Sequence, residues 1–146
     1  MIAVEVSKIL MTEKLILIAS AKTFKEIPFY FRLAGKLNLH KLIPATLLKQ
    51  QNFIMDWFFG IETEPEKRLL REILLDTDTE FLKWSINSIM NWRNETIPES
   101  LTHIHGSADR ILPNRFIKAD FIVNGGGHFM TVNKSLEINA LLKTIL

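Results

Sequence analysis

The chain has 146 residues, of which 47% are hydrophobic, 23% charged and 10% aromatic, a composition typical of one folded globular domain. The net charge is only +2 and lysine and arginine are spread along the chain, so we do not expect a nucleic-acid-binding protein. The absence of cysteine excludes disulfides, a thiol nucleophile and cysteine metal ligands. The longest apolar run, Leu15–Ala21, is far shorter than the about 20 residues of a membrane helix. We therefore expect a cytoplasmic protein without a membrane span.

The first twenty-one residues predict a helix followed by a buried strand. Apolar residues interspersed with Glu5 and Lys8 favour a mostly buried helix over residues 1–11, although residues 2–6 could also form a strand. Residues 15–21, LILIASA, form a short apolar run bounded by polar residues. Such runs are typical of parallel strands that helices cover on both faces.

Residues 24 to 93 are expected to be helical throughout. The first helix, with apolar residues at helical spacing, should be kinked or restarted by Pro28. Gly35 then permits a turn, and Pro44 opens a second helix that runs to Phe59 and is ended by Gly60.

Two further helices are predicted from their N-terminal signals. Thr63 and Thr77 are each followed three residues later by a glutamate, which is the spacing of a capping box. The first signal predicts a helix through Leu75 and the second a helix through Trp92.

The last third of the chain returns to strand patterns. Two short runs, residues 101–106 and 119–124, are predicted strands, and residues 135–146 form an amphipathic helix. Twelve residues, 107–118, separate the two strands, which is near the minimum for a parallel crossover, so antiparallel pairing stays open. The order of elements predicts an α/β fold with about three mostly parallel strands.

Two polar loops follow these strands and carry the candidate catalytic residues. Asp109 lies in HGSADRILP and His128 in NGGGHFM. Histidine is a general base near neutral pH, and a carboxylate that accepts its second ring N–H fixes its tautomer. The three glycines before His128 would allow positive φ values and a tight turn. These residues predict an acid–base pair.

The two segments resemble the loops after the seventh and eighth strands of the α/β-hydrolase superfamily, which carry the acid and the histidine of a catalytic triad. Residues 15–21 resemble the sixth strand. The resemblance implies a partial α/β-hydrolase core, residues 1–21 and 101–146, and a helical cap insertion, residues 22–100. It implies an esterase-type hydrolase acting on a small ester-like substrate, with His128 as general base oriented by Asp109 and with no cofactor.

No G-x-S-x-G motif occurs in the chain, so the serine nucleophile of the family is absent. Residues 1–11 resemble the helix that follows the nucleophile elbow. We therefore expect the reading frame to begin immediately after that elbow and these residues alone to be inactive. The open edge of strand 15–21 would then favour a homodimer.

Several alternatives remain open from the sequence. Asp109 could be a turn or N-cap residue, and His128 an exposed loop residue. A non-catalytic binding or relic module on the same fold is the second hypothesis. A metal-dependent hydrolase using His103, His105, Asp109 and His128 is the third, although His103 is expected to be a satisfied buried group and His105 to pack beside Gly106. Ser20, which lacks flanking glycines, is expected to be structural.

Overall fold

The computed structural model describes the backbone of residues 1–146 and every side chain except that of Ala45. One three-stranded sheet consists of β1 (Leu15–Ile18), β2 (Leu101–Gly106) and β3 (Phe121–Val123). Around it lie α1 (Ile2–Ser7), α7 (Met130–Asn133) and α8 (Ser135–Ile145). Between β1 and β2 come α2 (Phe29–Lys36), α3 (Ala45–Leu48), α4 (Phe53–Phe59), α5 (Glu64–Asp76) and α6 (Thr79–Met90). Short 3₁₀ helices are η1 (Phe24–Glu26), η2 (Leu39–Leu42) and η3 (Asn114–Phe116).

The sheet is entirely parallel, in the order β1-β2-β3, which confirms the predicted α/β class. Leu15 pairs with Leu101, and Ile104 pairs with Phe121. β1 ends at Ile18, earlier than predicted, because Ala19 has a φ of 46° and leaves the extended conformation. The connection between β2 and β3 is parallel although it contains only η3 instead of a full helix.

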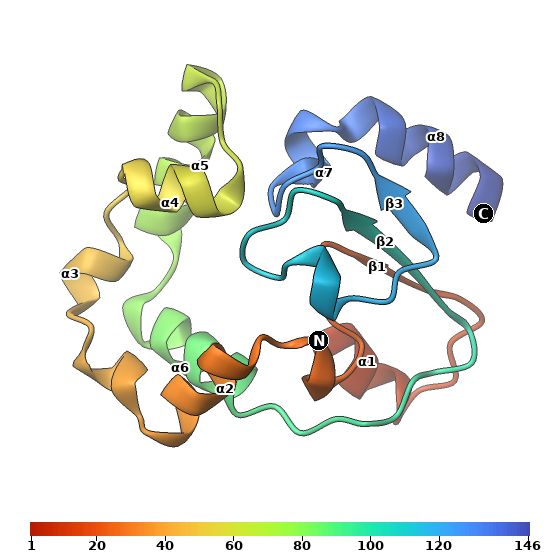
Figure 1. Ribbon diagram of the computed structural model, residues 1–146, viewed down its shortest axis with the longest axis horizontal. Coiled ribbons are helices and arrows are strands. Elements are labelled where there is room, and N and C mark those ends of the chain that lie inside the picture. The colour runs from red at the N-terminus through yellow and green to blue at the C-terminus, as the bar shows by residue number, and fades with distance from the viewer.

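The two faces of the sheet are covered by different helices. Ile16 and Ile18 pack with Ile104 and Ile138 in the cluster beneath α8. Leu15 and Leu17, which point to the opposite face because side chains alternate along a strand, pack with Val4 of α1. Figure 1 shows α8 on one side of the strands and α1 on the other. This burial on both faces explains why residues 15–18 are uniformly apolar.

The segment between β1 and β2, residues 22–100, extends to one side of the sheet (Figure 1), and we call it the helical segment. Pro28 restarts the chain as predicted: η1 precedes it and α2 begins directly after it. The turn predicted at Gly35 comes two residues later, at Leu37 and Asn38, directly after the end of α2. Gly35 is buried inside α2, where an added Cβ would lie 2.7 Å from Met90 Cβ, so this glycine permits the close packing of α2 on α6.

The helix predicted from Pro44 to Phe59 is divided into α3 and α4. Asn52 starts α4, since its side-chain oxygen accepts hydrogen bonds from the backbone N–H groups of Ile54 and Met55, both at 3.1 Å. Gly60 ends α4 in the left-handed conformation, as predicted.

The two predicted capping boxes differ in outcome. Thr63 and Glu66 form the first one at the start of α5. The second is wrong by one residue: Asp78 caps α6 by accepting from Phe81 N–H at 2.8 Å, whereas Thr77 ends α5 and donates to the Ile73 carbonyl.

β1 lies at the edge of the sheet, where it pairs with β2 alone. This is the open edge expected from the sequence, and the homodimer inferred from it stays a prediction. Among the helices of the described residues, none has the length and apolar character needed to cross a membrane.

Candidate acid–base site

The loops after β2 and β3 are held against each other at the carboxyl edge of the sheet. The backbone N–H of Ala108 donates to the Gly126 carbonyl at 2.9 Å, and that of Ser107 donates to the Val123 carbonyl at 3.0 Å. An added Cβ on Gly106 would lie 2.1 Å from the Gly126 oxygen, so only glycine allows this approach. The packing brings Asp109 and His128, which are 19 positions apart in the sequence, to the same edge of the sheet.

Asp109 uses both carboxyl oxygens. Oδ1 accepts hydrogen bonds from the backbone N–H groups of Ile111 and Leu112, at 2.9 and 2.8 Å. Oδ2 accepts from Nδ1 of His128 at 2.8 Å. The side chain is fully buried. Asp109 is therefore both a turn residue and a hydrogen-bond partner of His128, and its catalytic role stays a prediction.

His128 is accessible where Asp109 is not. Its side chain is 25% exposed, and its second ring nitrogen, Nε2, has no hydrogen-bond partner among the described residues. Because a carboxylate only accepts, the 2.8 Å contact places a proton on Nδ1, and in the neutral form of the ring Nε2 then carries the lone pair. An imidazole in this state can accept a proton from a hydroxyl or water that approaches Nε2.

The glycine run before His128 acts differently from the expectation. Only Gly125 has a positive φ, 68°. Gly126 and Gly127 are crowded: an added Cβ would lie 3.0 Å from Met130 Sδ at Gly126, and 3.0 Å from the Phe59 carbonyl oxygen and 3.1 Å from Gly60 Cα at Gly127. The glycines thus allow the His128 loop to contact the end of α4.

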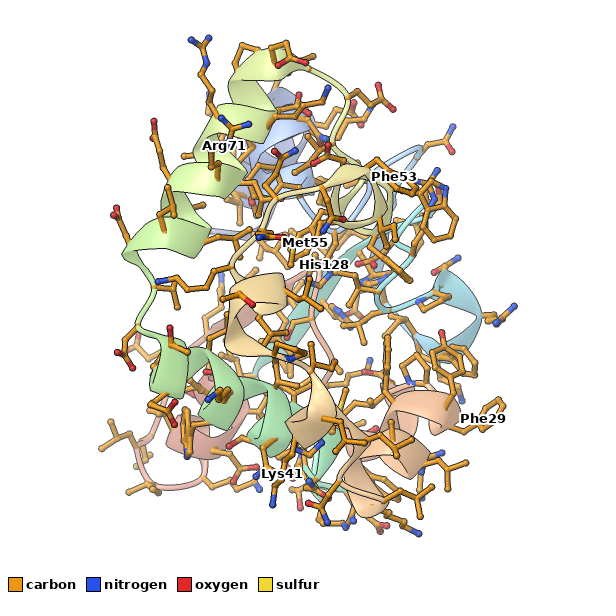
Figure 2. All side chains as sticks on the ribbon, turned by 90° about the vertical axis from the view of Figure 1, so that its left-hand side faces the viewer. Phe29, Lys41, Phe53, Met55, Arg71 and His128 are labelled. Carbon is orange, nitrogen blue, oxygen red and sulfur yellow. The ribbon has the colours of Figure 1, made fainter. Side chains whose placement is uncertain are left out.

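The end of α4 packs directly on the site. The Phe59 carbonyl accepts from the Phe129 N–H at 3.0 Å, and the Phe59 ring meets the His128 ring edge-on, with centroids 5.7 Å apart. Arg110 donates to the Trp57 carbonyl at 2.6 Å and stacks over its indole. Figure 2 shows His128 in the middle of the molecule, close in projection to Met55 of α4. The sequence pattern gave no means of selecting Phe59 among the aromatic residues of the helical segment.

His105 lies beside the pair and is fully buried next to Gly106, as expected. Its Nε2–H donates to the Leu112 carbonyl at 2.8 Å and lies 3.8 Å from Asp109 Oδ2. Burial lowers the pKa of His105 from its ordinary value. A neutral imidazole with its N–H directed at this turn supports the loop that places Asp109.

His103 is fully buried, as expected, but the expectation that it is satisfied is wrong: neither ring nitrogen has a hydrogen-bond partner. Burial, together with the neighbouring His105, lowers the pKa of His103 to about 4. The ring meets that of His105 edge-on with centroids 5.5 Å apart. His103 thus packs beneath the site as a neutral aromatic side chain.

The four residues of the metal hypothesis do not assemble into a metal site. No group of three or more His, Asp or Glu side chains in the described part of the chain could hold a metal ion. His105 Nε2 is bound to a carbonyl and Asp109 Oδ1 to two backbone N–H groups, so these atoms are already occupied.

A nucleophile is also missing from the contacts of His128. Ser20 accepts a hydrogen bond from the Met1 amino group at 3.2 Å, and Ser107 bonds to Asn124 and Gly125. Neither hydroxyl contacts His128 among the described hydrogen bonds. No family model and no curated protein matches the chain. The functional conclusion therefore depends on the geometry of Asp109 and His128.

Proposed function

We propose that this chain carries the acid–base half of a serine-hydrolase site of the α/β-hydrolase type, which acts on a small ester-like substrate once a nucleophile is supplied. The observation that carries the proposal is the 2.8 Å contact between His128 Nδ1 and the buried Asp109 Oδ2, made between loops that end adjacent parallel strands. The order β1-β2-β3 agrees with that expected of the last three strands of the family.

In the proposed reaction His128 Nε2 removes the proton of the nucleophilic hydroxyl and later returns it to the leaving alcohol. Asp109 holds the Nδ1–H tautomer and stabilises the imidazolium that forms. Its two backbone hydrogen bonds at Oδ1 keep Oδ2 directed at the ring. The Phe59 ring packs edge-on against the imidazole, with centroids 5.7 Å apart.

The start of α1 supports the expected position of the missing serine. The Met1 side chain packs against the cluster that contains Leu112, whose N–H donates to Asp109. A turn that preceded α1 would therefore end beside the Asp109 loop. We propose that the nucleophile is a serine on an elbow of the G-x-S-x-G type that approaches His128 beside this loop.

The test is to express the chain with the upstream reading frame and to measure hydrolysis of a p-nitrophenyl ester. We expect turnover that His128→Ala lowers by roughly 10²–10⁴-fold, because general acid–base catalysis contributes about that factor. Asp56 of α4 also has a carboxylate, which accepts hydrogen bonds from Gln51. Its substitution, Asp56→Asn, is the matched control and should leave turnover unchanged. If the upstream reading frame encodes no elbow, or if the extended protein does not hydrolyse the ester, the proposal fails and a non-catalytic module becomes the better hypothesis.

A second measurement uses the 146-residue chain itself. Nitrogen-15 NMR should show His128 with its proton on Nδ1, and Asp109→Ala should abolish that single tautomer. A mixture of tautomers in the unmodified chain would contradict the geometry independently of any activity.

A further inference from the structure

The positive charge of the chain is concentrated in one part of the helical segment. Residues 25–50, which include α2, η2 and α3, contain five lysine and arginine side chains and a single acidic one, Glu26. The rest of the chain has more acidic than basic residues, so the net charge of +2 depends on this stretch. Glu26 is buried and accepts hydrogen bonds from the backbone N–H groups of Lys22 and Lys118, at 2.8 and 3.2 Å. Residues 25–50 therefore carry no exposed carboxylate.

One face of α2 combines exposed apolar side chains with this charge. Phe29, Leu33 and Leu37 follow each other at a spacing of four residues, so they lie along one side of the helix. They are 62%, 53% and 60% exposed. Lys36, three residues after Leu33, is exposed on the same side. The opposite side is the buried one, because Gly35 packs on α6.

The helix η2 continues this surface. Leu39 and Leu42 are three residues apart and thus on one side of a 3₁₀ helix, and they are 47% and 78% exposed. His40 is buried, and its Nε2 lies 3.0 Å from a side-chain oxygen of α6. In Figure 2 Phe29 of α2 and Lys41 of η2 lie at the same lower end of the molecule. We call the exposed side chains of α2 and η2, within residues 29–42, the α2–η2 surface.

The lysines of the α2–η2 surface are available to a partner. Lys36 and Lys41 are exposed, and neither forms an ion pair among the described residues. Glu80 of α6, which lines a pocket together with Lys41, is already paired with Lys83 at 2.8 Å. Unpaired cations beside exposed leucine and phenylalanine side chains fit a partner that is both negatively charged and apolar.

The charge and the shape of the surface distinguish between possible partners. A second copy of the chain that docked by the same surface would place lysines opposite lysines, and like charges oppose association. An amphipathic peptide helix binds in a groove, whereas no residue of α2 lines either of the pockets of about 400 and 240 Å³. A membrane surface with anionic lipids requires no groove. Apolar side chains enter the boundary between headgroups and acyl chains, and lysines are attracted to the headgroups.

We propose that the α2–η2 surface docks the chain on a membrane that contains anionic phospholipids. The phenylalanine and leucine side chains insert at the level of the headgroups, and Lys36 and Lys41 interact with the lipid phosphates. The contact lies at the membrane surface and involves no membrane-spanning helix. It uses the helical segment alone and is independent of the proposed hydrolase function.

The test is co-sedimentation of the 146-residue chain with lipid vesicles. One set contains phosphatidylcholine alone, and the other contains equal amounts of phosphatidylcholine and the anionic phosphatidylglycerol. We expect at least about tenfold stronger binding to the anionic vesicles, because each lysine near such a surface contributes a factor of about five. The preference should fall as the salt concentration rises from about 0.1 to about 1 M, since salt screens the charges.

Three results of this experiment would overturn the proposal. They are no sedimentation with the anionic vesicles, equal binding to the two compositions, and a preference that salt does not reduce. The first of them would favour an acidic protein as the partner of the α2–η2 surface.

Two pairs of variants locate the contact. Lys41→Gln should weaken binding to the anionic vesicles about threefold to fivefold, whereas Lys143→Gln, at an exposed lysine of α8, is the matched control and should not change it. Leu37→Ser should weaken binding roughly fivefold to tenfold. Its control is Ile9→Ser, at an 83% exposed side chain after α1, where the lysine is paired with a glutamate. Equal effects within either pair would refute docking by the α2–η2 surface. All four side chains are exposed, so we expect the variants to fold, which circular dichroism checks.

Discussion

The loops after β2 and β3 differ from the helical segment in what they bury. The strand and loop that place Asp109 enclose three polar side chains, His103, His105 and Asp109, each at most 4% exposed. Between α2 and α6 few side chains are buried, among them Leu70, Leu74 and the polar His40, and large apolar side chains remain exposed, with Phe53 at 80%. This contrast indicates that the candidate site depends on polar groups buried by contacts across the sheet, whereas the helical segment is held by a small number of buried side chains.

The largest expected effect is that of Asp109→Ala. The substitution leaves two backbone N–H groups and His128 Nδ1 without their acceptor in a buried loop, so we expect a loss of about 3–5 kcal/mol in the free energy of unfolding. Asp56→Ala in α4, which removes the acceptor of one partly buried glutamine, should cost less than about 1 kcal/mol. Urea unfolding at pH 7 measures both. Similar losses for the two variants would remove the distinction between the regions.

A smaller difference in the free energy of unfolding is expected between alanine substitutions at two glycines. Gly106→Ala directs a methyl group at the Gly126 carbonyl oxygen, a backbone atom that cannot rotate away, so we expect a loss of about 3 kcal/mol and a displaced His128 loop. Gly35→Ala crowds Met90 but gains about 1 kcal/mol of helix propensity, and α6 can shift, so we expect a loss of about 1 kcal/mol. Thermal and urea unfolding rank the two, and NMR shifts at residues 124–130 report the loop. A greater loss for Gly35→Ala would reverse the comparison.

The third effect concerns the contribution of His103 to the pH dependence of the free energy of unfolding. Its pKa is about 4 in the folded chain and about 6.5 when unfolded, so between these values the unfolded state binds more protons and stability falls as the pH decreases. We expect His103 to account for a loss of about 2 kcal/mol between pH 7 and pH 5. His103→Leu should remove this part of the pH dependence and cost little at pH 7, because both ring nitrogens lack partners. An unchanged pH dependence in the variant would show that His103 is not buried as a neutral group.

Prediction from the sequence succeeds where the cause is local. Pro28 restarts a helix because it lacks an N–H, Gly60 ends one in a left-handed conformation, and Thr63 with Glu66 closes a capping box. Prediction fails where the conformation of a residue depends on a contact with a residue that is distant in the sequence. The sequence predicts a turn at Gly35, yet Met90, 55 positions later, makes this glycine a packing residue within a helix.

The candidate site shows the same division. The types and order of Asp109 and His128, each after an apolar strand, are sufficient to predict an acid–base pair from the residues alone. Continuous apolar runs that alternate with helical periodicity are likewise sufficient for the α/β class. Two contacts and one missing partner become evident only in the folded molecule: Asp109 Oδ2 lies 2.8 Å from His128 Nδ1, Phe59 packs on the imidazole, and the ring nitrogens of His103 have no hydrogen-bond partner. Strand pairing and the close approach of glycines across the sheet set these distances, and no local periodicity encodes them.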